Sequence, residues 1–327
     1  MTRVRWGVLG NAKIARDFVI PALRAARNGD VVALASRERD SAAAAAKRFA
    51  IPHLHGSYES LLASPEVDAV YIPLPNTLHV EWTQRAIAAG KHVLCEKPLA
   101  MRAGEIDALI SARDRSSLLV GEAFMVAHHP QWDLVARMIA EGRIGPLRMV
   151  EGSFSYRNLD RNNIRNRHEL GGGALRDIGV YPVVTTRIAT GKEALSASAR
   201  IEWDASFGTD TLAVCLVRFE GFDLSFYCGT QVARRQHMTF HGENGWLRLD
   251  APFNAGVYDV ARVILRLNDV AGTEETIFPQ ANHYQSLVEN FGDAILGKAT
   301  LKFPLESSRA NQRVIDMLFD AADGAPD

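Results

Sequence analysis

The sequence predicts an α/β protein of two domains, and three features of the chain carry that prediction. Short apolar strands alternate with helices through the first third, a turn of small residues follows the first strand, and strands follow one another directly through the last third. We expect an N-terminal Rossmann domain with a doubly wound parallel sheet over 1–122. A C-terminal α+β domain with a large, mainly antiparallel open sheet is expected over 123–327.

Bulk composition excludes several classes of protein. The 327 residues are 47% hydrophobic with a formal net charge of -1, which predicts ample core and no broad attraction to nucleic acid or an anionic membrane. No run is apolar enough for a membrane span, and Met1 to Gly10 is too short and too soon broken by glycine for an export signal. Three cysteines without metal-ligand spacing suit a reducing compartment, so we expect a cytoplasmic protein that holds no metal.

The elements of the first third follow in β-α order. Strands are expected over 4–9, 31–35, 68–72, 92–95 and 118–121, with a helix ending near 27 and others over 41–49, 77–89 and 102–115. The carboxyl edge of such a parallel sheet is where ligands bind.

A dinucleotide-binding turn is expected after the first strand. On the fingerprint G-x-G-x-x-G/A, the small positions are Gly10, Ala12 and Ala15. Glycine permits the tight turn, and the next helix presents unpaired amides to a pyrophosphate. Alanine at the second position weakens the motif, so an unrelated strand-turn-helix is the alternative. The residues expected at the cofactor are Gly10, Asn11, Ala12, Lys13 and Ile14.

The end of the second strand distinguishes the two nicotinamide dinucleotides. An NAD site places Asp or Glu there, whereas this chain has Ser36 and Arg37, which suit a 2′-phosphate. We therefore expect NADP. The neighbouring Glu38 leaves NAD open, and a solvated loop arginine is the structural alternative.

A proline-stiffened loop follows the strand over 68–72. Its residues Leu74, Pro75 and Asn76 are expected to contact the cofactor, although Asn76 can also cap the next helix. His79 is either packed within that helix or in contact with the cofactor.

The strand over 92–95 ends in Glu96, Lys97 and Pro98. Proline cannot donate to a ladder, so the strand stops and delivers a carboxylate and an amine to the ligand edge. Further on, an arginine-rich stretch leads through three glycines to a helix with Asp177 and Tyr181, four apart and so on one helix face.

Tyrosine and lysine together suit an alcohol oxidation. A tyrosine with a pKa near 10 is a poor base, and an adjacent ammonium such as Lys97 would lower the pKa of Tyr181 and organise proton transfer. The tyrosine takes the hydroxyl proton while a nicotinamide takes the hydride. The structural alternatives are a helix-dipole role for Asp177 and a core position for Tyr181.

These motifs resemble the Gfo/Idh/MocA family, named for glucose–fructose oxidoreductase and inositol dehydrogenase. The resemblance implies that Lys97 lies at the nicotinamide and the substrate hydroxyl, and that Tyr181 is the acid/base group with Asp177 fixing it or the substrate. It also implies cofactor contacts for Arg165 and Tyr284. The matching stretches are Gly7 to Ala15, Pro75 and Asn76 with His79, Ala89 to Pro98, and Gly171 to Tyr181.

One departure selects a branch of that family. Many members have histidine where this chain has Tyr181, and tyrosine there resembles glucose–fructose oxidoreductase, NADP-dependent aldose dehydrogenases and dimeric dihydrodiol dehydrogenase. We therefore expect hydride transfer between NADP and the hydroxyl or carbonyl of a sugar or polyol. A trans-dihydrodiol dehydrogenase and a non-catalytic NADP-binding sensor are the alternatives.

The last third reads as a sheet and two helices. Strands are expected over 196–203, 210–219, 222–229, 237–241 and 246–249, and helices over 282–296 and 305–321. The resemblance implies that this sheet forms the interface of a homodimer or homotetramer.

Overall fold

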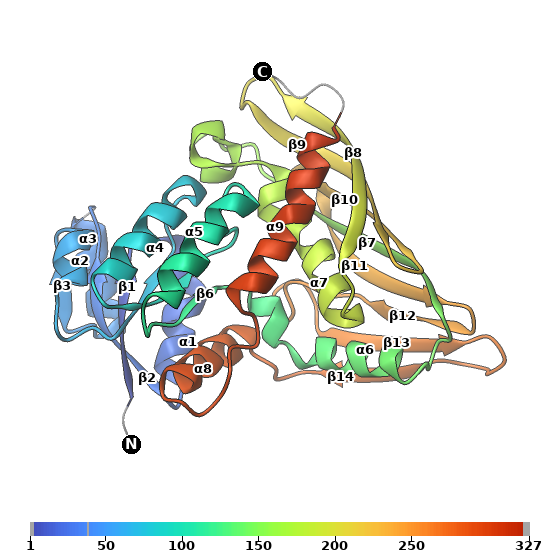
Figure 1. The fold of residues 1–327 in the computed structure, drawn as a ribbon, viewed down its shortest axis with the longest axis horizontal. Helices are drawn as coiled ribbons and strands as arrows, with labels where there is room; N and C mark the ends of the chain where they lie inside the picture. Colours follow the sequence, from blue (N-terminus) through green and yellow to red (C-terminus); the bar gives the residue numbers. More distant parts are fainter. Residues whose placement is uncertain (1–2, 38, 323–327) are drawn as a thin grey trace. The chain divides into compact units, whose positions relative to one another are not determined.

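The computed structural model describes residues 3–37 and 39–322, and its packing divides the chain into two compact units (Figure 1). The first unit comprises the chain up to residue 128 together with 283–309, and the second comprises 129–282 and the residues from 310 on. The sequence prediction has a single boundary at 122 and 123, whereas the chain returns to the first unit over 283–309.

The first unit contains a six-stranded, wholly parallel sheet in the order β3-β2-β1-β4-β5-β6. This is the order of a Rossmann sheet, so the predicted fold is confirmed. Its strands are β1 (Val4–Leu9), β2 (Gly29–Ala35), β3 (His53–His55), β4 (Ala69–Ile72), β5 (His92–Cys95) and β6 (Val120–Glu122).

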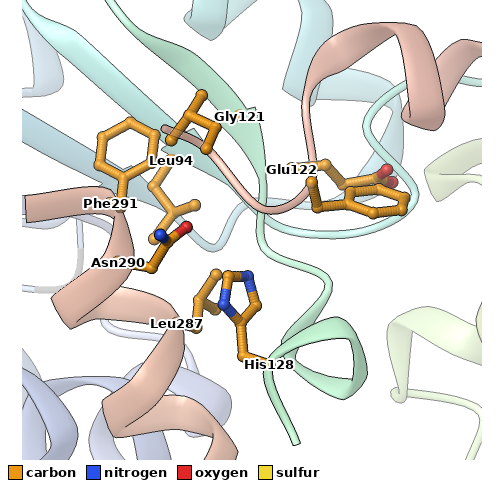
Figure 2. A pocket seen from close by; sticks show the side chains of 9 residues that line it. Leu94, Gly121, Glu122, His128, Leu287, Asn290 and Phe291 are labelled. Atoms are coloured by element: carbon orange, nitrogen blue, oxygen red, sulfur yellow. The ribbon is translucent and has the colours of Figure 1, made fainter. Parts of the chain in front are cut away.

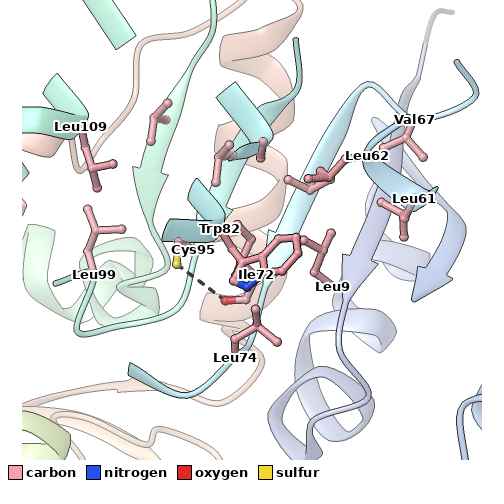
Figure 3. Packing of buried hydrophobic residues seen from close by; sticks show 14 of the residues in the cluster. Leu9, Leu61, Leu62, Val67, Ile72, Leu74, Trp82, Cys95, Leu99 and Leu109 are labelled. Carbon is pink, nitrogen blue, oxygen red and sulfur yellow. Dashed lines mark hydrogen bonds between the residues drawn. The ribbon is translucent and has the colours of Figure 1, made fainter. Parts of the chain in front are cut away.

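Helices flank this sheet because its strands are apolar on both faces. Every residue of β4 is buried, and Figure 3 shows Trp82 of one helix packed with Leu9 and Ile72 of the strands. The helices are α1 (Ile20–Ala25), α2 (Arg39–Phe49), α3 (Tyr58–Leu62), α4 (His79–Ala88), α5 (Ala103–Asp114) and α8 (His283–Ile295).

Helix α8 belongs to the first unit because both apolar and charged contacts hold it there. Phe291 packs against Trp6 of β1, with ring centroids 5.6 Å apart. Asp293 forms an ion pair with Arg27, which follows α1. These contacts join residues far apart in sequence, which is why a reading by sequence order does not place 283–309 with the first unit.

The second unit contains an eight-stranded sheet in the order β14-β13-β12-β11-β7-β10-β9-β8. Every neighbouring pair is antiparallel except β7 with β10, so the predicted mainly antiparallel sheet is confirmed. The strands are β7 (Leu147–Arg157), β8 (Ala194–Asp204), β9 (Thr209–Phe219), β10 (Asp223–Gly229), β11 (Gln231–Gly242), β12 (Gly245–Leu249), β13 (Ala261–Leu267) and β14 (Glu274–Phe278).

One face of this sheet is buried and the other is open. On β9, Ala213, Cys215 and Val217 are buried, while the alternate residues Val214 and Leu216 are 52% and 42% exposed. Helix α7 (Val180–Thr190) packs on β7 and β10, and α6 (Pro130–Ala140) packs on α7. The last helix, α9 (Leu305–Asp320), runs from the first unit into the second.

Candidate active site

The turn after β1 has the shape that the dinucleotide fingerprint requires. Gly10 has φ +116°, a conformation that favours glycine, and its N–H donates to the carbonyl of Ala35 at 2.8 Å. Asn11 donates from Nδ2 to the hydroxyl of Ser41 at 2.7 Å. Its Oδ1 is buried and accepts no hydrogen bond from the part of the chain that the structure describes. That oxygen is a ready acceptor for a hydroxyl or an amide of a bound nucleotide.

The first helical segment begins at Lys13, directly after this turn, as predicted. Lys13 is exposed and pairs with Asp17 one turn later, while the guanidinium of Arg16 donates to the carbonyl of Asn11. Ala15 is fully buried where a π-helical turn, η1 (Ala15–Val19), leads into α1. The buried alanine lets the helix approach the sheet closely.

Ser36 and Arg37 follow β2 directly, at the same carboxyl edge of the sheet. Ser36 is 5% exposed, and Arg37 is exposed. Glu38, which kept NAD open in the sequence analysis, lies outside the described residues.

The loop after β4 is fixed by His79. This side chain is fully buried, with Nδ1 2.7 Å from the carbonyl oxygen of Pro98 and Nε2 2.7 Å from that of Leu74. Both ring nitrogens are thus engaged by backbone, which favours the packed position over direct contact with a cofactor. The expected cap is wrong, because Leu78 is the N-cap of α4 and Asn76 begins a short 3₁₀ turn, η2 (Asn76–Leu78).

The end of β5 delivers Glu96 and Lys97 to the ligand edge, and the Lys97–Pro98 peptide is cis. Both side chains are half-buried. The hydroxyl of Tyr71 donates to Oε1 of Glu96 at 2.6 Å. Burial, and then the Glu96 carboxylate, raise the pKa of Tyr71 well above its usual value, so this phenol stays protonated and keeps its donor role.

Tyr284 of α8 also belongs to the first unit. Its ring stacks on Phe18, with centroids 4.9 Å apart and planes inclined by 24°. The sequence motif around it gave no hint of this stacking partner.

In the second unit Asp177 receives two hydrogen bonds on one oxygen. The hydroxyl of Tyr156 donates to Oδ2 at 2.7 Å, and Nε of Arg165 donates to the same atom at 2.8 Å. Asp177 is 8% exposed, and its charge raises the pKa of Arg165 above the usual value for arginine. Arg165, expected at the cofactor, therefore orients Asp177 in this structure. Tyr156, the residue before the last of β7, was not predicted from the sequence as part of the site.

Tyr181 lies in the first turn of α7, in contact with two aromatic rings. Its ring lies 5.3 Å from that of Phe154 and 5.5 Å from that of Phe253, measured between centroids, and the residue is 4% exposed. Asp177 lies before it in a π-helical turn, η6 (Leu175–Gly179). The expected single α-helix is thus interrupted between the two residues.

Two of the three glycines before η6 have a structural cause. A Cβ on Gly173, whose φ is +122°, would lie 1.9 Å from Oδ1 of Asp210, and one on Gly172 would lie 2.4 Å from the carbonyl oxygen of Arg165. Asp210 accepts the N–H of Leu175 at 2.6 Å and so begins the helical segment that carries Asp177. Burial raises the pKa of Asp210 to about 6.

A second carboxyl at the ligand edge, Glu122, escaped the sequence analysis. It ends β6, is 5% exposed and accepts the N–H of Leu99 at 2.8 Å. Figure 2 shows it beside a cavity that His128 and Asn290 also line. The cavity volume is about 10 Å³, room for one water molecule and far too small for a sugar or a nicotinamide.

The described residues contain neither a membrane-spanning helix nor a cluster of metal ligands. No helix there is long and apolar enough to cross a membrane. Nor do three or more His, Cys, Asp or Glu side chains gather in the described part of the chain so as to hold a metal ion.

The Rossmann sheet and the residues at its carboxyl edge define a two-domain protein of the dinucleotide-binding type. Residues 4–124 match the model of an oxidoreductase family with an NAD-binding Rossmann fold, and 132–248 match the GFO/IDH/MocA C-terminal domain. The chain therefore belongs to the GFO/IDH/MocA oxidoreductase family, which confirms the resemblance of its motifs.

Several relatives align over nearly the whole chain. An uncharacterized oxidoreductase of Rhizobium meliloti is 40% identical over 99% of this chain and 98% of its own. D-xylose 1-dehydrogenase (NADP(+)) 2 of Haloferax volcanii is 32% identical over 97% of both. The crystal structure of KijD10, a 3-ketoreductase from Actinomadura kijaniata in complex with NADP and TDP-benzene, superposes with a TM-score of 0.90 at 32% identity, covering 98% of each chain.

Proposed function

We propose that this protein is an NADP-dependent oxidoreductase that transfers a hydride between the cofactor and a hydroxyl or carbonyl carbon of a sugar. The observation that carries the proposal is Lys97, which follows β5 at the same sheet edge as the Gly10 turn. An amine at that edge can bind the substrate oxygen whose proton is exchanged.

The first unit fits a dinucleotide. The glycine turn, the buried acceptor of Asn11 and the helix start at Lys13 suit a pyrophosphate and its ribose. Arg37 after β2 suits the 2′-phosphate of NADP. The xylose dehydrogenase is named for NADP, and the 3-ketoreductase was solved with it, which supports the same choice here.

The proposed chemistry divides between the cofactor and three side chains. A bound nicotinamide supplies the hydride acceptor or donor. In the oxidative direction Tyr181 takes the hydroxyl proton, Lys97 stabilises the ionised phenol, and Asp177 orients the reacting oxygen or the phenol. Tyr156 and Arg165 fix the carboxylate of Asp177 for this role.

Solved variants of one relative concern a tyrosine and a lysine. KijD10 has been solved with a tyrosine replaced by phenylalanine and, separately, with a lysine replaced by alanine, in both cases with TDP-benzene and NADP. They are the residue types of Tyr181, to which the proposal assigns proton transfer, and of Lys97, to which it assigns stabilisation of the phenolate.

The substrate class is tested by nicotinamide absorbance with a matched panel. Aldoses, inositols and cyclic vicinal diols are offered with NADP, and keto-sugars, free or nucleotide-linked, with NADPH. Turnover with a sugar supports the proposal, while turnover with diols alone would replace it by a dihydrodiol dehydrogenase. Tight NADPH binding without turnover across both panels would favour a cofactor sensor.

We further propose that the open face of the second unit's sheet joins two copies of the chain. Val214 and Leu216 are exposed on adjacent outward positions of β9. Light scattering should give a dimer or tetramer for the unaltered protein and smaller particles for Leu216→Glu. A monomer at micromolar concentration would contradict this assembly.

A further inference from the structure

The peptide group that follows the Lys97–Pro98 turn is held at both of its polar ends. The carbonyl of Pro98 accepts from Nδ1 of His79 at 2.7 Å, and the N–H of the same peptide, on Leu99, donates to Oε1 of Glu122 at 2.8 Å. We propose that His79 and Glu122 form a clamp on the Pro98–Leu99 peptide and act as positioning residues for Lys97 in catalysis. This inference rests on the proposed function.

Both residues of the clamp are buried and lie on regular secondary structure. His79 is 0% exposed on α4, and Glu122 is 5% exposed at the end of β6. Strand β6 is paired with β5, with Glu122 opposite Cys95, so the carboxyl stands beside the end of the strand that carries Lys97. The N–H of Ala123 donates to the carbonyl of Cys95 at 2.7 Å and fixes that spacing.

His79 extends the clamp to the cofactor loop. Its Nε2 lies 2.7 Å from the carbonyl of Leu74, in the loop expected to contact the cofactor. Both partners of the ring are carbonyls, which only accept, so two hydrogen bonds form only when both ring nitrogens carry protons. A neutral ring carries one N–H and donates to one of the two carbonyls, so His79 lies between the turn at Lys97 and the loop at Leu74 and bonds to both only when it is protonated.

Burial and the neighbouring charges shift the pKa values of both clamp residues. Burial lowers the pKa of His79, and the Lys97 ammonium lowers it further, while the two carbonyls raise it. Burial raises the pKa of Glu122 to about 7, with Glu96 raising it and Leu99 and Lys97 lowering it. His128, on the shared cavity, has its pKa lowered to about 3 and is therefore neutral.

Two substitutions, Glu122→Met and Glu122→Gln, distinguish the loss of the clamp from a general loss of stability. Methionine fills a similar volume without an acceptor, so Leu99 loses its bond, and a shift of the turn by about 1 Å should lower kcat about 100-fold. Glutamine keeps the amide oxygen as an acceptor and should restore most of kcat while removing the Glu122 titration from the pH profile. KM for the substrate should change far less than kcat.

Lys91→Met is the matched control. Lys91 is 8% exposed at the other end of β5, where Nζ donates to the carbonyls of Ser64 and Val67 at 2.8 and 2.7 Å. Its loss should lower thermal stability comparably to Glu122→Met but leave kcat near the unaltered value. Hydrogen exchange at Leu99 should accelerate about tenfold in Glu122→Met and remain slow in Lys91→Met.

A double-mutant cycle decides whether the two residues act on one peptide. His79→Phe and Glu122→Met together should lower kcat much less than the product of the single losses, because either change alone releases the peptide. Losses that multiply, a Glu122→Met kcat equal to that of Lys91→Met, or a glutamine variant as poor as methionine would each overturn the clamp. Absence of turnover by the unaltered protein would instead overturn the proposed function, and this inference with it.

Discussion

Replacing Gly173 by alanine should destabilise the second unit severely, because a new methyl group meets a buried carboxyl. The added Cβ would lie 1.9 Å from Oδ1 of Asp210, and the backbone has φ +122°. Relief requires Asp210 to move and lose the bond from Leu175, a cost of about 1–3 kcal/mol, on top of about 1–3 kcal/mol of backbone strain. We expect a loss of about 4 kcal/mol in the free energy of unfolding.

Gly191 supplies the matched control for that substitution. It ends α7 with φ +66°, and a Cβ there meets nothing within 4 Å. Gly191→Ala therefore tests the positive φ without the clash and should cost about 1 kcal/mol. Urea unfolding measures the free energy of unfolding of both variants. In a Gly173→Ala, Asp210→Ala double variant the carboxyl that clashes is gone, so the loss of unfolding free energy should be smaller than the sum of the two single losses.

Two results would exclude a clash between the new methyl group and Asp210. One is a free energy of unfolding for Gly173→Ala within 1 kcal/mol of that for Gly191→Ala. The other is strict additivity with Asp210→Ala. The substitution should also reduce turnover, because the carbonyl of Gly173 accepts the N–H of Asp177 at 3.1 Å.

Three further predictions concern the cofactor, the chemistry and pH. Arg37→Ala should weaken binding of NADPH about tenfold while leaving NADH nearly unchanged, measured by cofactor fluorescence; equal losses would exclude the 2′-phosphate contact. Lys97→Met should lower kcat at least about 100-fold yet retain NADPH binding, and unchanged turnover would remove its role. Because burial raises the pKa of Asp210 to about 6, its stabilising effect is complete below about pH 4 and lost as the pH rises through about 6. Between about pH 4 and pH 8 the free energy of unfolding of the unaltered protein should therefore fall by up to about 3 kcal/mol more than that of Asp210→Asn. Parallel curves of unfolding free energy against pH would exclude the raised pKa of Asp210.

Most of the fold was accessible from sequence because its strands are marked by local pattern. Strands β1, β4 and β5 are short apolar runs, and the Gly10 turn has the shape its motif predicts. Elements without such a pattern were missed. Strand β3 has three largely exposed residues, α3 has five residues and shows little periodicity, and β13 and β14 lie beyond the last predicted strand.

The candidate site residues were named one by one from the sequence and stay a prediction, while the contacts that hold them were not predicted. The motifs single out Lys97, Asp177 and Tyr181 by local spacing. The partner of Gly173 is Asp210, and the partner of Leu99 is Glu122; in both pairs the sequence gives no periodicity that links the two residues. Such pairings depend on sheet topology, which only the folded chain specifies.

Isotope transfer tests whether a hydride passes from NADPH to a carbon of the sugar. The protein is incubated with a keto-sugar and NADPH carrying deuterium at the reactive carbon of its nicotinamide, and the product is analysed by mass spectrometry. We predict one deuterium on the former carbonyl carbon, with Tyr181→Phe slowing its appearance at least about 100-fold. A reduced sugar without deuterium from either face of the labelled cofactor would exclude this hydride transfer, and equal rates in both proteins would exclude the role of Tyr181.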